Sequence, residues 1–309
     1  MTEVGGTEVG GAAATGAAVG AVAAVIVNYN ARDHLLPCIQ SLRADGVQRI
    51  VVVDNDSHDG SAETLADGDP EARWLPTGAN LGYGTAANLG VAATTEPYVL
   101  VLNPDVVVEP GAVKALSAAL DRDPRLALVG PRVEEPDGTR YPSARRFPDL
   151  VTAAGHAFLG YVAPSNRFSR AYKLADQDPD QPHDVDWISG SCFLARRRAY
   201  EEVGGFDESY FMYVEDVDLC WRLGRAGWRV GYEPAGRVVH AGAASTNQTP
   251  YRMILEHHRS LWRFACKSTS GARRATLPLV AAGLVARTGT AWAQRAVEDG
   301  RSRIRTSPE

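Results

Sequence analysis

The sequence predicts an α/β protein in which helices flank a mostly parallel sheet and a helical extension follows at the C-terminus. Apolar runs of strand length lie at 22–27, 49–53 and 98–102, and each leads directly into polar residues. Stretches with helical spacing, among them 35–42 and 110–120, separate these runs, which is the order typical of a parallel sheet. After residue 250 the pattern becomes helical and basic.

We therefore divide the chain into a disordered leader at 1–20, an α/β domain at 21–250 and a basic amphipathic helical extension at 251–309. The leader is mostly Gly, Ala, Thr and Val, and it carries Glu3 and Glu8 where a secretory signal would carry positive charge. The extension holds eleven Lys or Arg against four Asp or Glu, in a chain of net charge −5. Its longest apolar stretch is too short to cross a membrane.

The composition is that of an ordinary soluble protein, with 45% hydrophobic and 22% charged residues. Four widely spaced cysteines, Cys38, Cys192, Cys220 and Cys266, predict neither a zinc site nor a disulfide framework. Reduced cysteines fit a cytoplasmic protein. We expect no nucleic-acid partner.

Polar residues gather where the first two predicted strands end. Asn28 follows the first strand, and Asp54 and Asn55 follow the second. In open parallel sheets ligands bind beyond the carboxyl ends of the strands, which makes these side chains candidates for nucleotide binding. Asp54 can accept from the N3–H of a uracil or thymine ring. The alternative is an Asx-rich turn between strand and helix.

A glycine-rich loop at 76–88 opens into a helix and contains Asn80 and Gly82. Glycines permit close backbone approach, and the free amides of a helix N-terminus suit a diphosphate. The loop lacks the Gly-Lys-Ser/Thr of a Walker motif. After the third strand, Asp105 provides one carboxylate that can hold a divalent cation bridging the diphosphate of a nucleotide sugar.

Four carboxylates flank an aromatic segment further along the chain. They are Asp207, Glu208, Glu215 and Asp216. Carboxylates beside apolar rings are groups whose basicity can be tuned, which favours a catalytic role. The alternative is that Glu215 and Asp216 occupy the first turn of a helix, where the macrodipole stabilises negative charge. Asp218 lies about 200° further round such a helix and is expected to point elsewhere.

Seven motifs, in order along the chain, resemble those of the family two, inverting glycosyltransferases of GT-A fold. They are 25–30, 53–57, 80–82, 102–105, 204–208, 215–219 and His240. The resemblance implies a GT-A fold, a nucleotide-sugar donor and transfer with inversion. It also implies donor-binding roles for Asn28, Asp54, Asn55, Asn80, Gly82 and Asp105. Asp216 matches the catalytic base, with Glu215 and Asp207 as further candidates.

The resemblance further implies a divalent metal, Mg or Mn, held by Asp105 and His240. The usual first acid of the metal motif is Asn103 here, so the diphosphate is expected to provide most of the ligands. Imidazole binds Mn more readily than Mg. The alternative for His240 is a partly buried structural histidine.

Three segments, 76–86, 136–145 and 187–192, resemble the actinobacterial rhamnosyltransferases of this family. This implies transfer of L-rhamnose from dTDP-L-rhamnose to a polyprenyl-diphosphate-linked N-acetylglucosamine in cell-wall linker synthesis. The alternative is another nucleotide sugar, such as a UDP-hexose, on a different cell-wall or capsular acceptor. Two other classes are a nucleotidyltransferase, whose triphosphate loop 28–31 does not match, and an inactive sugar-binding subunit, which the retained carboxylates disfavour.

The region between 131 and 186 and the C-terminal extension bear on the acceptor. The first scatters Arg140, Arg145, Arg146 and Arg167 among Tyr, Pro and Phe, which suits phosphate recognition or, equally, a solvated loop. In the extension, 251–264 and 273–297 mix basic and apolar residues as an interfacial anchor does. We therefore expect a membrane surface as a partner and a peripheral location at the inner face of the plasma membrane. The alternative is a helical pair packed on the core.

Overall fold

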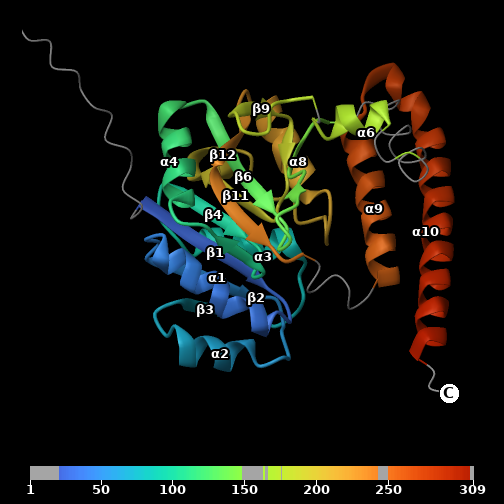
Figure 1. Ribbon diagram of the computed structural model, residues 1–309. Coiled ribbons are helices and arrows are strands. Elements are labelled where there is room, and N and C mark those ends of the chain that lie inside the picture. The colour runs from blue at the N-terminus through green and yellow to red at the C-terminus, as the bar shows by residue number, and fades with distance from the viewer. Residues whose placement is uncertain (1–20, 148–162, 164–165, 175, 243–249, 307–309) are drawn as a thin grey trace, which may run out of the picture.

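The structure, a computed structural model, describes residues 21–147, 163, 166–174, 176–242 and 250–306 (Figure 1). The predicted leader at 1–20 lies outside these residues. An α/β body contains the described residues up to 242, and two long helices, α9 (Pro250–Ser268) and α10 (Leu277–Thr306), stand beside it (Figure 1).

One ten-stranded sheet forms the centre of the body, in the order β3-β2-β1-β4-β11-β6-β12-β5, with β7 on β6 and β9 on β12. Its strands are β1 Val22–Asn28, β2 Arg49–Asp54, β3 Arg73–Pro76, β4 Tyr98–Leu102, β5 Val106–Val108, β6 Leu126–Glu134, β7 Arg140–Tyr141, β9 His183–Val185, β11 Cys192–Arg196 and β12 Arg229–His240. The first four strands of the chain are parallel neighbours, as are β6 and β12, whereas β11 runs antiparallel between β4 and β6. The predicted α/β class is confirmed, with a sheet that is parallel in its N-terminal half and mixed beyond it.

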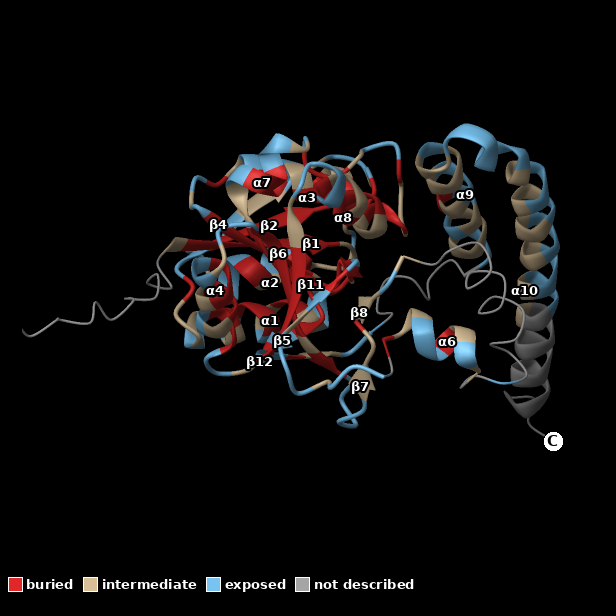
Figure 2. Cartoon of the chain, turned by 90° about the horizontal axis from the view of Figure 1, so that it is seen from above, coloured by how far each residue is buried: buried red, intermediate tan, exposed pale blue. Residues whose placement is uncertain are grey.

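Helices cover both faces of this sheet. They are α1 Arg32–Ala44, α2 Ser61–Gly68, α3 Tyr83–Ala92, α4 Ala112–Arg122, α7 Arg197–Glu202 and α8 Glu215–Arg225. The short helix α6 (Arg167–Tyr172) lies away from the sheet, on the side of the C-terminal helices (Figures 1 and 2). Ile26 of β1 packs in the cluster that includes α1 and α4. Its neighbour Val25, on the opposite face of the sheet, packs in the cluster that includes α3 and α8. Figure 2 shows the buried residues, in red, in the sheet and on the inner sides of these helices. Burial on both faces explains the nearly continuous apolar runs of the central strands.

In the sequence, residues 187–195 have the pattern of one further strand, and this prediction is wrong. The segment is divided into β10 (Trp187–Ile188), which pairs with β8 (Ala144–Arg145) in a separate two-stranded sheet, and β11 in the main sheet. Ser189 N–H donates to Ser143 O over 2.8 Å, and Asn103 N–H donates to Ser191 O over 2.9 Å. These two hydrogen bonds pull the residues between the strands toward different neighbours, so the chain turns at Gly190 instead of continuing straight.

The long strand β12 returns the chain to the end of β4. Its pairing with β6 is irregular between Glu233 and Arg237. Beyond this point β12 pairs antiparallel with β5, with His240 opposite Val106. Ala241 N–H then donates to Asp105 O over 3.0 Å. This pairing brings residues that are more than a hundred positions apart to one corner of the sheet.

Helix α9 is attached to the body by charge and by packing. Lys267 Nζ lies 2.7 Å from a carboxylate oxygen of Asp218 and 2.7 Å from one of Asp207. The ring of Phe264 meets Trp221 of α8 edge-on, with centroids 6.0 Å apart. Helix α10 in turn packs on α9 after a 3-10 turn, η3 (Gly271–Thr276). Both predicted C-terminal helices are therefore present, and α9 packs on the core.

None of the helices in the described part of the chain combines the length and the apolar character that crossing a bilayer requires.

Candidate active site

The polar residues after the first two strands lie side by side. Asn28 pairs in register with Asp54 across β1 and β2, and its Nδ2 donates to Asp54 Oδ1 over 3.0 Å. Ser57 N–H donates to the other carboxylate oxygen, Asp54 Oδ2, over 3.1 Å. Asn28 and Asp54 are both buried, yet Asn28 Oδ1 has no hydrogen-bond partner among the described residues. The parallel pairing of β1 and β2 thus brings together Asn28 and Asp54, both predicted to bind the nucleotide sugar. It leaves Asn28 Oδ1 able to accept a further hydrogen bond.

Asn55 connects the end of β2 to the glycine-rich loop. Its Nδ2 donates to Asn80 Oδ1 over 3.0 Å and to Gly82 O over 3.2 Å, and its Oδ1 accepts from Leu81 N over 2.9 Å. Gly82 has φ = +87°, and a Cβ there would collide with Phe211 O, so glycine is required. The loop and β2 therefore form one unit at the N-terminus of α3, where free amides suit a diphosphate.

Asp105 and His240 meet at the corner made by β5 and β12. Asp105 Oδ1 lies 3.1 Å from His240 Nε2, and Asn103 Nδ2 lies 3.3 Å from the same nitrogen. Burial opposes the ionised form of Asp105, but the hydrogen bond from His240, the charge of that imidazole and a backbone hydrogen bond together outweigh it and hold the pKa of this carboxyl below its usual range. Asp105 therefore carries a negative charge at neutral pH.

The ligand atoms that Asp105 and His240 offer decide whether the pair can bind a divalent metal ion. The described residues contain no cluster of three or more His, Cys, Asp or Glu side chains suited to a metal. A small divalent cation needs only one or two protein ligands when substrate phosphates supply the rest. One carboxylate and one imidazole fit a cation of this kind, shared with a diphosphate.

Asp216 lies in the first turn of α8 and faces the turn between β10 and β11. Gly190 N–H donates to Asp216 Oδ2 over 2.9 Å, and Val217 N–H donates to Oδ1 over 2.8 Å. The hydroxyl of Tyr83 in α3 donates to Gly190 O over 2.5 Å. Burial raises the pKa of Asp216, while the two N–H groups and the charge of Arg145 oppose this rise. These contacts fix the orientation of a carboxylate whose basicity exceeds the ordinary value.

The other carboxylates of this region have different surroundings. Glu215 is buried and its Oε2 has no partner among the described residues; burial, and then the charge of Asp216, raise its pKa. Partial burial of Asp207 is outweighed by hydrogen bonds from Lys267 and Ser209, and its pKa falls to about 2. Asp218 is fully buried between Arg222, at 2.6 Å, and Lys267. Of these four acids, Asp216 has the properties that best suit a general base.

The backbone before α8 is strained. Tyr213 and Val214 both have positive φ, +66° and +69°, a conformation that is costly for a β-branched residue. The preceding residues are held on two sides, because Phe211 O accepts from Tyr83 N over 3.1 Å and Met212 O accepts from the Ser260 hydroxyl of α9 over 3.0 Å. The glycine-rich loop and α9 therefore support the turn that presents Asp216.

Sequence reasoning named neither Tyr83 nor Gly190 as a site residue, although both lie within the segments singled out above. Gly190 acts through its backbone N–H and carbonyl, which carry no side-chain signal. Tyr83 acts through a contact with a residue 107 positions away. Both are visible only once α3, α8 and the β10–β11 turn are placed together.

Comparison with known proteins identifies the class to which this fold and site belong. Residues 23–204 match the family model described as glycosyl transferase family 2, which covers more than half of the chain. The chain therefore belongs to glycosyl transferase family 2, and the predicted inverting glycosyltransferase is confirmed.

Individual relatives agree with this assignment. The chain is 42% identical over 266 residues to the N-acetylglucosaminyl-diphospho-decaprenol L-rhamnosyltransferase of Mycobacterium tuberculosis (strain ATCC 25618 / H37Rv), covering 82% of this chain and 86% of the relative. It is 25% identical over 257 residues to the rhamnosyltransferase WbbL of Escherichia coli (strain K12), covering 80% and 93%.

Solved structures show the same fold. GalNAc-T7 with UDP, GalNAc and Mn2+ superposes with a TM-score of 0.54 at 15% identity, covering 71% of this chain and 43% of that one. The mannosyltransferase PcManGT from Pyrobaculum calidifontis, in complex with GDP-Man and Mn2+, gives a TM-score of 0.52 at 16% identity, covering 89% and 75%. The predicted GT-A fold is thereby confirmed.

We predict that Asp216→Asn lowers kcat by about 10² or more with little change in donor affinity, because the amide keeps the shape of the side chain but cannot accept a proton. Steady-state kinetics and a donor titration measure both quantities. Since burial raises the pKa of Asp216, wild-type activity should also fall with decreasing pH at a value above the ordinary carboxyl range.

Asp218→Asn is the matched control two residues away. It weakens the buried pairs with Arg222 and Lys267. The free energy of unfolding should therefore fall by about 1–3 kcal/mol, and kcat should stay nearly unchanged. Near-normal turnover of Asp216→Asn, or a loss of donor binding in proportion to rate, would transfer the role of base to Glu215 or Asp207.

Proposed function

We propose that this enzyme transfers L-rhamnose from dTDP-L-rhamnose to a polyprenyl-diphosphate-linked N-acetylglucosamine in cell-wall linker synthesis. The observation that carries the proposal is the 42% identity, over most of both chains, to the mycobacterial relative whose name states the sugar and the acceptor. The alternative within the same fold is another nucleotide sugar, such as a UDP-hexose, on a different cell-wall or capsular acceptor.

The proposed mechanism assigns one task to each part of the site. Asp54, with Asn28, holds the nucleotide base, and the loop with Asn80 and Gly82, which Asn55 fixes in place, holds the diphosphate at the start of α3. Asp216 accepts the proton of the acceptor hydroxyl as that oxygen attacks the anomeric carbon from the face opposite the leaving diphosphate, which inverts the configuration in a single displacement.

Asp105 and His240 are the residues that would hold a divalent metal in this mechanism. Bound there, Mg or Mn would neutralise negative charge on the leaving diphosphate. The Mn2+ in the two solved structures named above supports a divalent cation as cofactor. The 3.1 Å separation of the carboxylate and imidazole supports these two ligands.

The donor and acceptor are tested with a panel of nucleotide sugars and a short-chain prenyl-diphosphate-linked N-acetylglucosamine. We expect turnover with dTDP-L-rhamnose and little with UDP-hexoses. The same panel without acceptor is the control for donor hydrolysis. Turnover with a UDP-hexose in place of dTDP-L-rhamnose would contradict the proposed specificity and leave the reaction class intact.

Metal dependence is tested by chelation. EDTA should abolish transfer, and an excess of Mg or Mn should restore it, because the uncompensated diphosphate is a poor leaving group. Asp105→Asn should raise the metal concentration needed for half-maximal activity. Full activity in EDTA would show that the enzyme works without a metal.

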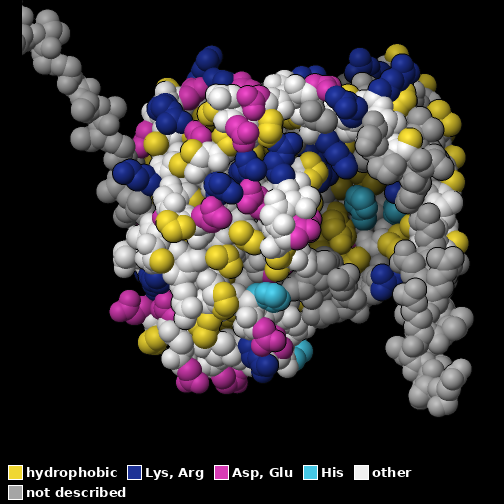
Figure 3. All heavy atoms as spheres, viewed as in Figure 1, with side chains coloured by type: hydrophobic (Ala, Val, Ile, Leu, Met, Phe, Trp, Pro, Cys, Tyr) yellow, Lys and Arg dark blue, Asp and Glu magenta, His cyan; other side chains and the backbone are white. Residues whose placement is uncertain are grey.

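We propose further that the C-terminal helices bring the enzyme to the inner face of the plasma membrane. Figure 3 shows hydrophobic side chains, in yellow, along the outer edge of these helices and basic ones, in dark blue, at their upper end. Leu279 and Val285 of α10 are 71% and 73% exposed, and Arg273 and Arg274 lie in η3. Exposed apolar residues next to basic ones suit an interface with anionic lipid, where a prenyl-linked acceptor resides.

Sedimentation with vesicles tests this location. The wild type should bind vesicles containing anionic lipid, and replacing Leu279 and Val285 together by Asn should weaken the binding several-fold without affecting the fold, since both side chains are exposed. Vesicles of neutral lipid alone are the control. Absence of binding, or equal binding by the double variant, would leave α9 and α10 with a packing role only.

A further inference from the structure

The side chain of Arg145 in β8 is surrounded by aromatic rings. Its guanidinium carbon lies 4.9 Å from the ring centroid of Trp187 and 5.5 Å from those of Tyr141 and Tyr172. Nε donates to Pro142 O over 2.7 Å, and the terminal nitrogens lie 3.0 Å and 3.5 Å from the hydroxyls of Tyr141 and Tyr172. Rings and oxygens together hold the guanidinium in one orientation.

All the hydrogen-bond partners of Arg145 in the described residues are neutral oxygens, and it forms no ion pair with any of the described carboxylates. Stacking on rings stabilises a cation only partly, and three oxygens do not use all five guanidinium N–H groups. Asp216 is close enough for the two charges to interact but is not in contact, so a directly bound anion is what this guanidinium lacks among the described residues. A phosphate is the strongest candidate, because the planar fork of arginine matches two phosphate oxygens.

Arg145 lies next to the turn that holds the proposed base. β8 pairs with β10, with Arg145 opposite Trp187. Ser189 N–H donates to Ser143 O, and the following residue, Gly190, donates to Asp216. The short segment 187–190 therefore contacts both β8 and Asp216, and Arg145 and Asp216 lie close enough for their charges to interact.

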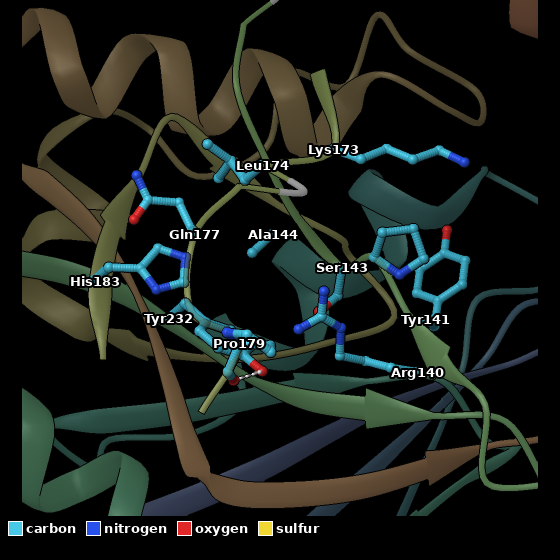
Figure 4. Close-up of a pocket in the computed structure, with 11 residues that line it drawn as sticks. Arg140, Tyr141, Ser143, Ala144, Lys173, Leu174, Gln177, Pro179, His183 and Tyr232 are labelled. Carbon is cyan, nitrogen blue, oxygen red and sulfur yellow. Dashed lines mark hydrogen bonds between the residues drawn. The ribbon is translucent and has the colours of Figure 1, made fainter. Parts of the chain in front are cut away.

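A pocket continues from this position along the β7–β8 segment (Figure 4). It is lined in part by Arg140, Tyr141, Ser143, Ala144, His183 and Tyr232, and none of its lining residues is acidic. In Figure 4 the guanidinium of Arg140 and the ring of His183 point into the cavity from opposite sides, whereas the Lys173 ammonium is directed away. Tyr141 borders both this pocket and the ring enclosure of Arg145. The Arg140 guanidinium thus points into a pocket that adjoins the ring enclosure of Arg145.

We propose that Arg145 binds the acceptor phosphate next to the sugar, and that Arg140 in the adjoining pocket binds the second phosphate. The inference rests on the proposed function, which requires an acceptor whose sugar lies between the attacking hydroxyl and a diphosphate. When the hydroxyl is at Asp216, the diphosphate must lie about one hexose ring away, and Arg145 is a cation within that reach. Tyr141 and Tyr172, which are half-buried, offer aromatic surface that the sugar can contact.

Two acceptors that differ only in charge provide the test. One is a short-chain prenyl-diphosphate-linked N-acetylglucosamine, and the other is an alkyl glycoside of N-acetylglucosamine, which has no phosphate. Arg145→Gln should raise KM for the diphosphate acceptor about tenfold or more and change KM for the alkyl glycoside and for the donor little. Loss of its charge beside Asp216 should change kcat for both acceptors alike, so KM is the quantity that reports phosphate binding. Arg145→Lys should restore part of the affinity, because it keeps the charge without the fork.

Arg170→Gln is the matched control, an arginine of the same region whose exposed side chain pairs with Asp176. It should leave both acceptors unaffected. If Arg145→Gln fails to fold, as its unfolding midpoint will show, Arg140→Gln takes its place, with the same expected effect on the diphosphate acceptor. An equal rise in KM for both acceptors, or no change in KM for the diphosphate acceptor, would overturn the assignment while leaving the proposed function in place.

A binding measurement separates this inference from the proposed function. If the wild type transfers sugar to neither acceptor, the proposed function fails, and calorimetry with inorganic pyrophosphate in EDTA decides the role of Arg145 by itself. Weaker pyrophosphate binding by Arg145→Gln than by Arg170→Gln would support a phosphate site. Equal binding by both variants, or no binding by the wild type, would overturn it.

Discussion

The backbone of Gly190 is the point at which the separate parts of this site are held together. Its carbonyl accepts from Tyr83 in α3, and its N–H donates to Asp216 in α8. Since α3 begins at the glycine-rich loop, this one residue connects the region suited to a diphosphate with the carboxylate suited to proton transfer. A base and a leaving group must keep a fixed separation for in-line displacement, and the two peptide groups on either side of the Gly190 Cα, each held by one hydrogen bond, maintain it.

The acidic residues around α8 show how the fold divides similar side chains among different tasks. Asp207 and Asp218 are neutralised by Lys267 of α9, and Asp218 also by Arg222. Glu215 is buried with no cationic partner in the described chain. Asp216 alone of the group faces the β10–β11 turn, with backbone N–H groups as partners. Permanent charges thereby stabilise the α8–α9 junction, and the carboxylate with raised basicity remains at the site.

The sequence predicts local features of the site better than its long-range contacts. Asn28, Asp54 and Asn55 were identified because polar residues after apolar runs mark the ends of parallel strands, and parallel register brings the first two into hydrogen-bond distance. The sequence does not show which of the acids around α8 are neutralised by a cation. Asp207 and Asp218 are neutralised by Lys267, which lies about 50 residues further along the chain, whereas Glu215 and Asp216 are not. The interruption of the strand at 187–195 was missed, because the bond from Ser189 to Ser143 depends on where β8 packs.

The irregularity in β12 affects how this chain can tolerate insertions. Side chains alternate between the two faces of a strand, so one extra residue between Arg237 and His240 would turn the imidazole away from Asp105. The pairing of β12 with β6 is already out of step between Glu233 and Arg237. A residue added there can be taken up as a larger bulge, and the final three residues of the strand keep their alignment with β5. The two halves of β12 thus differ in their tolerance of insertions. The first half can accommodate an added residue, whereas the length of the second half fixes the position of the His240 imidazole.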